Sequence, residues 1–311
     1  MTVEQTGRAD VIYIAGSGRN GSTLLGLQLE RSAQVRFAGE LTHIWQRGYV
    51  NNELCGCGQP FQRCDFWSEV TRSTFGTFTP ADARHAVELR KTVSRFRNLP
   101  WLLLGCKGIA RDAVAEYGQL YVPLVRAISQ HSGCPYVVDS SKYPTDLAAL
   151  RQLPEVRVRV LHLIRDCNAV VYSWKRKKQR TEIHWQQVMM PRYGALQTAL
   201  GWKLFNRTIQ RIMRSSMDHY RTLRYEDLTT QFDGTMNQLF TWLKLDDADL
   251  SAEFKRHNHA IAGNPCRFDF DAQHVRIDEQ WRTEMKTLDR LTVRLLCQAD
   301  QRQFGYLDGE S

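Results

Sequence analysis

The residues with the clearest chemical potential lie in a glycine-rich segment near the start of the chain. Residues 11–15 are apolar, and Gly-Ser-Gly-Arg-Asn-Gly-Ser-Thr follows them. Gly16 and Gly21 keep the G-x-x-x-x-G spacing of a phosphate-binding loop and Thr23 stands at its Ser/Thr position, but Ser22 replaces the lysine. In nucleoside triphosphatases this lysine reaches the β- and γ-phosphates. The loop therefore suits a ligand with a terminal 5′ anion and no γ-phosphate.

The backbone of such a loop binds an anion whatever its side chains are. N–H groups at the start of the following helix point at the ligand, and the positive end of the helix dipole favours negative charge. Arg19 would supply the charge that the missing lysine leaves out. The alternative is that the glycines form only a turn between a strand and a helix.

Composition indicates an ordinary globular protein. The chain has 311 residues, of which 42% are hydrophobic and 24% charged. We expect one domain over residues 1–311 with an irregular insertion at about 51–80, a lid or substrate loop. The net charge of +9 suits an anionic ligand, but it suits nucleic acid or an acidic membrane surface equally well. The polar N-terminus and the lack of long apolar runs predict a soluble, cytoplasmic protein without stable membrane insertion.

Strand-like and helix-like stretches alternate along the chain, which indicates an α/β fold with a mainly parallel sheet. The prediction is a P-loop-containing three-layer fold whose central sheet of about five strands is flanked by helices. The predicted strands are residues 11–15, 35–39 and 156–164, a short strand between a turn and a polar tip within 133–142, and a strand with its following turn over 220–228. The predicted helices are residues 21–32, 111–131, 165–174, 193–217 and 288–303.

Three cysteines stand close together at Cys55, Cys57 and Cys64. Their C-x-C-x6-C spacing has neither the paired C-x2-C of common zinc sites nor a fourth ligand nearby. A structural loop is the preferred interpretation. A disulfide would need an oxidising compartment, and a metal site would need a fourth ligand from elsewhere in the chain.

Four segments in this order resemble one family. Gly16 to Leu25 is similar to the 5′-phosphosulfate loop of the sulfotransferases that use 3′-phosphoadenosine 5′-phosphosulfate (PAPS). Leu163 to Ser173 is similar to their 3′-phosphate segment, Arg224 to Leu228 to their Y-E-D-L signature, and Gly263 to Arg267 to their G-N-x-x-R loop. The chain resembles most the bacterial relatives of the carbohydrate and tyrosylprotein branches.

The resemblance implies a set of residues for PAPS, used as a co-substrate. Arg165 would clamp the 3′-phosphate with its bidentate fork, and the Ser173 hydroxyl would add a donor. Tyr225 would lie against the adenine. The other residues implied are Gly18, Arg19, Asn20, Gly21, Ser22 and Thr23 at the 5′ end, and Gly263, Asn264 and Arg267 at the 3′ end. The alternative for Arg165 is a surface ion pair with Asp166 or Glu226.

Sulfuryl transfer needs in-line positioning, a base for the acceptor proton and a cation near the bridging oxygen. Glu40 matches the G-E base of the tyrosylprotein branch and is the preferred general base, with His43 as the rival. The alternative is that Glu40 is a capping or salt-bridge residue. Lys142 resembles the active-site lysine of the family and would stabilise the leaving phosphate together with Arg19. No metal is expected in this chemistry.

The acceptor is not identified by the sequence. A small molecule, glycan or lipid with a hydroxyl or amine group is expected, nucleic acid is not expected, and the oligomeric state is open. Aromatic residues of the irregular segments are candidates for the acceptor pocket: Trp45, Tyr49, Trp67, Trp185 and Trp281.

Two other functions compete with this reading. A P-loop nucleotide-dependent kinase or phosphotransferase would need an acid for Mg²⁺, for which Asp139 is the candidate. A non-catalytic polyanion-binding protein would use the basic run at residues 174–180.

Overall fold

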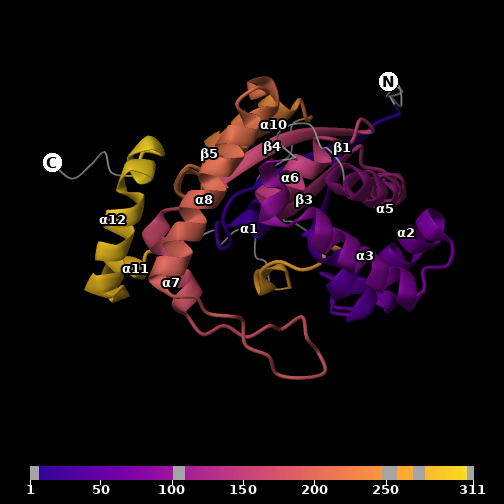
Figure 1. Ribbon diagram of the computed structural model, residues 1–311, viewed down its shortest axis with the longest axis horizontal. Helices are drawn as coiled ribbons and strands as arrows, with labels where there is room; N and C mark the ends of the chain where they lie inside the picture. The colour runs from indigo at the N-terminus through magenta and orange to yellow at the C-terminus, as the bar shows by residue number, and fades with distance from the viewer. Residues whose placement is uncertain (1–6, 101–108, 247–257, 269–276, 307–311) are drawn as a thin grey trace.

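A parallel sheet in the order β2-β3-β1-β4-β5 forms the centre of the molecule (Figure 1). The structure is a computed structural model that describes residues 7–100, 109–246, 258–268 and 277–306. The strands are β1 (Ala9–Ala15), β2 (Val35–Gly39), β3 (Tyr136–Lys142), β4 (Val156–Ile164) and β5 (Tyr220–Arg224). Every neighbouring pair is parallel, so all five carboxyl ends lie along one edge of the sheet.

Alternating side chains of β1 pack into two separate hydrophobic cores, as expected for a central strand covered on both faces. Val11 and Tyr13 belong to one buried cluster, and Ile12 and Ile14 belong to the other. The alternation makes β1 apolar throughout and fixes the sheet as the middle of three layers.

Helices from different parts of the chain cover the two faces. The first face packs against α5 (Ile109–Ser132), α6 (Pro144–Leu150) and part of α8 (Ala195–Met213), with α2 (Asp65–Phe75) and α3 (Pro80–Val93) outside α5. The second face packs against α1 (Ser22–Leu29), α9 (Tyr225–Thr230) and α10 (Phe232–Leu243). A third cluster joins α7 (Cys167–Lys175), α8 and α12 (Thr287–Gln303), with α11 (Trp281–Glu284) beside α7 (Figure 1).

The predicted fold class is confirmed, and the differences concern particular elements. The segment 220–228, predicted as a strand with its following turn, is a strand as far as Arg224, and helix α9 begins at Tyr225 in place of the turn. The predicted helix over 193–217 is α8 and is shorter at both ends. Besides α2, the α-helices of the described residues that were not predicted are α3, α6, α9, α10 and α11. The buried residues of α10 do follow helical spacing, so the signal for this helix was present in the sequence: Met236, Leu239, Phe240 and Leu243.

The segment predicted as an irregular insertion at about 51–80 is irregular only in its first half. Residues 51–64 contain turns and one short 3₁₀ helix, and α2 then begins at Asp65. Trp67 and Val70 lie three residues apart on the buried side of α2. This helical spacing was hidden among the cysteines, glycines and aromatic residues around it.

Among the helices that the structure describes, none combines the length and the apolar character needed to cross a lipid bilayer.

The contact of α1 with β2 generates a testable prediction. A Cβ atom on Gly26 would lie 2.3 Å from Cε2 of Phe37, which is buried. Gly26→Ala should therefore destabilise the protein by about 1–3 kcal/mol, although alanine is the better helix former. Urea unfolding of the variant and the parent protein measures the difference.

Gly201 in α8 is the matched control, because nothing lies within 4 Å of a Cβ atom built there. Gly201→Ala should stabilise the protein by roughly 0.5–1 kcal/mol through helix propensity alone. Equal effects of the two substitutions would contradict the close packing of α1 on β2.

Candidate functional site

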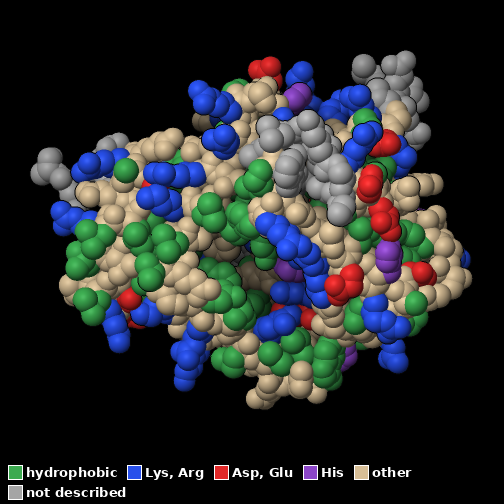
Figure 2. All heavy atoms as spheres, in the orientation of Figure 1, with side chains coloured by type: hydrophobic (Ala, Val, Ile, Leu, Met, Phe, Trp, Pro, Cys, Tyr) green, Lys and Arg blue, Asp and Glu red, His purple; other side chains and the backbone are tan. Residues whose placement is uncertain are grey.

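A pocket of about 850 Å³ opens at the carboxyl edge of the sheet. Figure 2 shows a hollow in this face with Lys and Arg side chains around it. Each strand contributes residues at or just after its end, as expected for open parallel sheets. The predicted site residues that line the pocket are Gly18, Arg19, Gly21, Ser22, Thr23, Glu40, His43, Lys142, Arg165, Ser173, Tyr225, Gly263 and Asn264. A smaller pocket of about 440 Å³ beside β5 and α10 contains none of them.

The glycines of the loop after β1 allow two aromatic rings to approach its backbone. A Cβ atom on Gly21 would lie 2.3 Å from Cδ2 of Tyr225, and one on Gly18 would lie 2.7 Å from Cζ2 of Trp174. Gly21 also has φ 94° and directly precedes α1. Side chains at these positions would displace both rings, so the glycines shape the pocket as well as the turn.

Arg19 and Asn20 of this loop have different roles: Arg19 lines the pocket and Asn20 does not. Arg19 has a left-handed backbone (φ 69°), and its guanidinium lies 4.7 Å from the ring centre of Trp174. Asn20 is fully buried and does not line the pocket: its Nδ2 donates to the carbonyl of Leu163 at 2.9 Å, and its Oδ1 accepts from the amide of Ser22 at 3.2 Å. Asn20 thus holds the loop against β4 rather than facing a ligand.

The structure brings Glu40, Lys142 and His43 together. Lys142 Nζ donates to Glu40 Oε1 at 2.5 Å and to the carbonyl of Ser140 at 2.9 Å. On the other side, His43 Nε2 lies 3.4 Å from Glu40 Oε2. Lys142 adopts φ 73°, a conformation that is rare for residues with a side chain and common at functional sites.

The protonation states of this group follow from burial and from the cations nearby. Burial raises the pKa of Glu40, but the neighbouring Lys142 and other basic groups have the larger opposite effect. The pKa of Glu40 is therefore lowered to about 2. Burial lowers the pKa of His43 to about 3, against the attraction of Glu40. At neutral pH the pair is therefore a carboxylate beside an uncharged imidazole.

Arg165 follows β4 and is almost fully buried. Its guanidinium lies over the Tyr225 ring at 4.5 Å from the ring centre, and its NH2 group is 4.0 Å from Oδ2 of Asp278. The alternative of a surface pair with Asp166 or Glu226 is wrong, because Arg165 is buried and both carboxylates accept from other groups. Asp166 Oδ1 accepts from the Asn168 amide at 2.6 Å, and Glu226 Oε2 accepts from the Tyr306 hydroxyl at 2.7 Å.

The loop at Gly263 and Asn264 contacts the glycine-rich loop that follows β1. The Asn264 amide donates to Thr23 Oγ1 at 3.1 Å, and a Cβ atom on Gly263 would lie 3.0 Å from the same oxygen. Arg267 is fully buried and does not line the pocket, since its NH1 donates to the Gly263 carbonyl at 3.3 Å. Of the predicted residues, Asn20 and Arg267 therefore brace the pocket wall from behind.

The pocket has a strong excess of positive charge. Its lining includes two acids, Glu40 and Glu182, and five basic residues: Arg19, Arg47, Lys142, Arg165 and Arg180. Among the described lining residues, five side-chain atoms are buried without a hydrogen-bond partner: Ser17 Oγ, Arg19 Nε, Arg165 Nε, Thr198 Oγ1 and Glu182 Oε2. Unpaired donors in a cationic pocket fit an anionic ligand with several oxygen acceptors.

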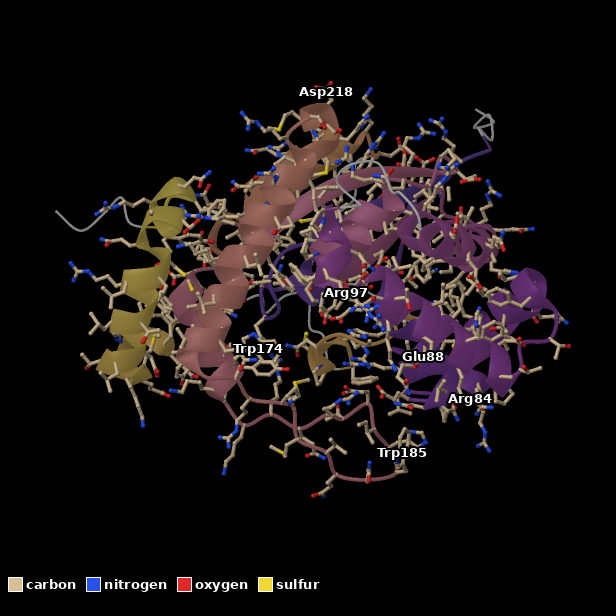
Figure 3. The ribbon with its side chains drawn as sticks, viewed as in Figure 1. Arg84, Glu88, Arg97, Trp174, Trp185 and Asp218 are labelled. Atoms are coloured by element: carbon tan, nitrogen blue, oxygen red, sulfur yellow. The ribbon has the colours of Figure 1, made fainter. Side chains whose placement is uncertain are left out.

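Sequence reasoning missed several residues of the pocket lining. Trp174 lies at the end of α7, and the chain then runs through residues 176–194, where Trp185 is labelled (Figure 3). Arg180 from this segment pairs with Glu182 at 2.8 Å and with Glu53 at 2.9 Å. The basic run at 174–180 was the available signal, whereas nothing marked Arg47.

The proposed aromatic lining of the acceptor pocket is wrong for the described pocket. None of Trp45, Tyr49, Trp67, Trp185 and Trp281 lines it. Trp45 and Trp67 are fully buried core residues of the layer around α2 and α3. The aromatic residues at the pocket are Tyr143, Trp174, Tyr193, Trp202, Phe205 and Tyr225.

Asp139, the candidate acid of a kinase, faces away from the pocket. It is buried and accepts from the Tyr121 hydroxyl at 2.9 Å and from the amide of Ser141 at 2.9 Å. Burial raises the pKa of Asp139 to about 6. This carboxylate holds the turn after β3 in place and does not lie where it would reach a nucleotide-bound metal.

Known protein structures resemble this chain in fold, whereas sequence comparisons find no match. No protein-family model matches the sequence, and no curated protein sequence matches it. The sulfotransferase domain of the Synechococcus PCC 7002 olefin synthase matches 96% of this chain and 98% of its own with a TM-score of 0.51 and 19% identity. The sulfotransferase domain of the curacin biosynthetic pathway (TM-score 0.49, 15% identity) matches 96% of this chain and 98% of its own. Sulfotransferase STF9 from Mycobacterium avium (TM-score 0.49, 13% identity) matches 96% of this chain and 77% of its own. The likeness to the olefin synthase domain shows that this chain has the fold of a sulfotransferase domain.

The lowered pKa of Glu40 predicts a specific pH dependence of stability. A carboxyl whose pKa falls from 4.5 to about 2 on folding stabilises the folded state above the unfolded pKa. That contribution is lost as the pH falls from 4.5 toward 2. The free energy of unfolding of the parent protein should therefore exceed that of Glu40→Gln by roughly 1–3 kcal/mol at pH 7, and the gap should shrink below pH 4.5.

His43 provides a second variant with its own pH window. Its folded pKa of about 3 lies below the ordinary 6.5, so the unfolded state binds the proton first and the protein loses stability as the pH falls from 6.5 toward 3. His43→Asn should flatten the stability profile in that range and leave the Glu40 contribution present. Parallel profiles for the parent and both variants would show that neither group is shifted by folding.

Proposed function

We propose that this protein is a PAPS-dependent sulfotransferase that transfers the sulfuryl group to a hydroxyl acceptor. The observation that carries the proposal is the contact of Lys142 with Glu40 at 2.5 Å, beside a phosphate loop that has no lysine of its own. The fold of the chain, that of a sulfotransferase domain, supports the same reaction class.

The two ends of the pocket fit the two anionic ends of PAPS. The loop from Gly16 to Thr23 and the N-terminus of α1 offer a site for the 5′ group, with Arg19 beside them. Arg165, which has a buried Nε without a partner, offers a site for the 3′-phosphate. The Tyr225 ring between them, in contact with Gly21 and Arg165, offers a flat surface for the adenine.

Lys142 has two tasks in the proposed reaction. In the structure its ammonium compensates the buried charge of Glu40, at a position where an anionic 5′ group would compete for it. Once the ammonium contacts that group, Glu40 loses its main source of a lowered pKa and becomes a stronger base. The same ammonium, with the Arg19 guanidinium, then stabilises the charge that develops on the leaving oxygen.

Glu40 receives the proton of the acceptor hydroxyl as the acceptor oxygen forms its bond to sulfur. The bond between sulfur and the bridging oxygen breaks, and the electron pair leaves with 3′,5′-diphosphoadenosine. The transition state for such a transfer is loose, so positioning and charge stabilisation carry most of the catalysis. His43 is uncharged beside Glu40 and orients the carboxylate on the side away from Lys142.

The two competing functions find less support. The kinase reading lacks the phosphate-loop lysine, and Asp139 is engaged in the sheet. The polyanion-binding reading would place the basic residues on an open surface, whereas Arg19, Lys142 and Arg165 line a pocket and Arg165 is buried.

Ligand binding tests the donor. In the absence of divalent metal, 3′,5′-diphosphoadenosine at a hundredfold excess over its dissociation constant should stabilise the protein by about 2.7 kcal/mol. Arg165→Ala should weaken its binding by about 1.5–3 kcal/mol and weaken AMP binding much less, because the guanidinium meets only the 3′-phosphate. Calorimetric titration of the two nucleotides measures both effects.

Arg176→Ala is the control for Arg165→Ala. Arg176 contacts the same Asp278 carboxylate, at 3.2 Å, but does not line the pocket. Its removal should leave the preference for 3′,5′-diphosphoadenosine over AMP intact. Stabilisation by ATP with magnesium and none by 3′,5′-diphosphoadenosine would favour the kinase, and stabilisation by oligonucleotides alone would favour the polyanion-binding protein.

Glu40→Gln tests the base. The substitution keeps the shape of the side chain and removes the proton acceptor, so turnover should fall by roughly 10²–10⁴ while the affinity for 3′,5′-diphosphoadenosine survives. A screen of hydroxyl compounds with labelled PAPS supplies the acceptor for this assay.

His43→Ala should have a much smaller effect on turnover. If His43→Ala abolishes turnover and Glu40→Gln leaves it near normal, the histidine is the base. If Glu40→Gln also loses nucleotide binding, its role is to hold the pocket together.

A further inference from the structure

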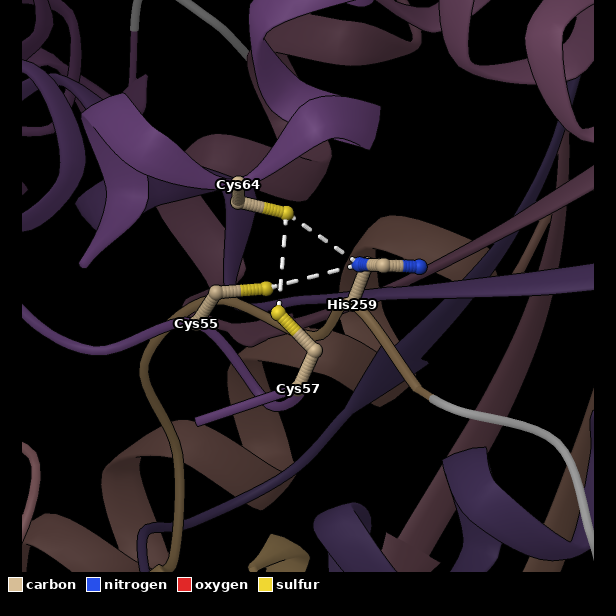
Figure 4. Close-up of side chains that lie close together, drawn as sticks. All are labelled: Cys55, Cys57, Cys64 and His259. Atoms are coloured by element: carbon tan, nitrogen blue, oxygen red, sulfur yellow. Dashed lines mark hydrogen bonds between the residues drawn. The ribbon is translucent and has the colours of Figure 1, made fainter. Parts of the chain in front are cut away.

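Three cysteines and one histidine meet on the side of the fold where the segment after Asn51 packs against residues 258–264 (Figure 4). Their ligand atoms, the sulfurs of Cys55, Cys57 and Cys64 and Nδ1 of His259, all lie within 4.8 Å of one another. Cys57 Sγ is 3.7 Å from Cys64 Sγ, and His259 Nδ1 is 3.3 Å from Cys64 Sγ and 3.7 Å from Cys55 Sγ. None of these residues lines the pocket described above.

These separations are those of ligands around one tetrahedral ion. With metal–sulfur bonds of about 2.3 Å and a metal–nitrogen bond of about 2.0 Å, tetrahedral geometry places two sulfurs about 3.8 Å apart and a sulfur about 3.5 Å from the nitrogen. The three distances given above, 3.3 to 3.7 Å, are close to these values, and the other ligand pairs lie within 4.8 Å.

The backbone around Cys55 and Cys57 is shaped for this convergence. The Gly58 amide donates to the Cys55 carbonyl at 2.8 Å, and Gly58 has φ 83°. A Cβ atom on Gly56 would lie 1.8 Å from Oδ1 of Asn258, next to His259. The two glycines therefore allow the cysteine segment to turn back tightly and to lie against the histidine segment.

His259 is held in place by contacts that do not involve the cysteines. Its carbonyl accepts from Trp67 Nε1 at 2.8 Å, and its ring stacks on Phe66 at 4.7 Å between ring centres. Burial of Cys55 and Cys64 removes two of the thiols from solvent. The four ligands are thus oriented by the fold before any ion is considered.

We propose that Cys55, Cys57, Cys64 and His259 bind one Zn²⁺ ion in a closed structural site. Three soft sulfur ligands and an imidazole in tetrahedral arrangement are the donor set that selects zinc among the common divalent metals. Binding converts the three thiols to thiolates and releases their protons, and the histidine binds as the neutral imidazole. Four protein ligands leave no open position for a substrate, so the ion acts on structure.

The ion would fix one wall of the functional pocket. His259 is two residues before Ile261, whose carbonyl accepts from the Glu40 amide at 2.9 Å. Gly263 follows and lies against Thr23. The metal site therefore ties residues 55–64 to the segment that positions Glu40 and the phosphate loop.

The sequence alone did not give this site because its fourth ligand lies far from the other three. His259 follows Cys64 by 195 residues. The C-x-C-x6-C spacing was visible, but only folding places the imidazole beside it.

Metal analysis of the full chain tests the proposal. Protein produced with zinc in the medium, and purified under reducing conditions without chelators or metal-affinity resin, should contain about one zinc per chain. X-ray absorption at the zinc edge should show three sulfur neighbours at about 2.3 Å and one nitrogen at about 2.0 Å. These two measurements need no variant, so they stand even if substitutions prevent folding.

Variants separate this site from adventitious binding. Cys64→Ser and His259→Ala should fall below about 0.2 zinc per chain, whereas His259→Cys should retain the ion with four sulfur neighbours. Cys134→Ser is the control, because Cys134 is also a buried free cysteine but lies outside the cluster. It should keep the full zinc content.

Several results would overturn the proposal. Parent protein without zinc that also fails to bind added Zn²⁺ or Co²⁺ would do so, as would equal zinc content in Cys64→Ser and Cys134→Ser. A Cys57–Cys64 disulfide in the freshly purified chain would assign the cysteines a different role.

A second readout concerns the pocket and rests on the proposed function. Removal of the ion by a chelator should weaken the binding of 3′,5′-diphosphoadenosine by roughly tenfold or more, and zinc should restore it. Zinc at full occupancy without nucleotide binding would leave the metal site intact and contradict only the proposed function. Nucleotide binding that is unchanged after the ion is removed would contradict the link between the two sites.

Discussion

Parallel hydrogen bonding of the five strands is the constraint on which the site depends. Because every strand points the same way, the loop after β1, Glu40 after β2, Lys142 at the end of β3, Arg165 after β4 and Tyr225 after β5 meet along one edge. These residues are spread over more than two hundred positions of sequence. The sheet converts that spread into one pocket without requiring any of them to be near another in the chain.

This convergence brings several charged side chains close together in a partly buried pocket. Lys142 and Glu40 neutralise each other. Arg165 donates to the carbonyls of Arg19 and Asp278, and among the described residues its carboxylate partner is Asp278, at 4.0 Å. A buried cation that lacks a close partner is costly unless a ligand supplies the anion. A ligand with anionic groups would balance this charge better than a neutral ligand would.

The parts of the site that follow regular elements could be predicted, and the rest could not. Glu40 and Arg165 each come directly after a strand whose apolar pattern is plain in the sequence. Asn20 and Arg267 were recognised as part of the site, but their inward direction depends on carbonyl groups of other segments, which a motif does not describe. His43 and Lys142 were named separately, while their shared contact with Glu40 follows only from the pairing of β2 with β3.

Two aromatic residues were predicted to lie at the pocket but are core residues. Trp45 and Trp67 were assigned to irregular segments and named as candidates for the acceptor pocket. In the structure these side chains fill a core between α2, α3 and the π-helix at Ile44–Val50. Large apolar surface is buried wherever a second layer of helices exists, and local composition does not reveal such a layer.

Residues 258–264 hold part of the pocket in position although they form no regular strand or helix. They join the sheet through one isolated bridge, between Gly39 and Ile261. A Cβ atom on Gly39 would lie 2.2 Å from the Ile261 carbonyl oxygen, so the two backbones are in direct contact. Any shift of this segment would therefore move the Glu40 amide that donates to the same oxygen. A strand gains its precision from repeated hydrogen bonds, whereas this segment has few. An ion bound by His259 and the three cysteines would restrain the segment two residues away from the contact that positions Glu40.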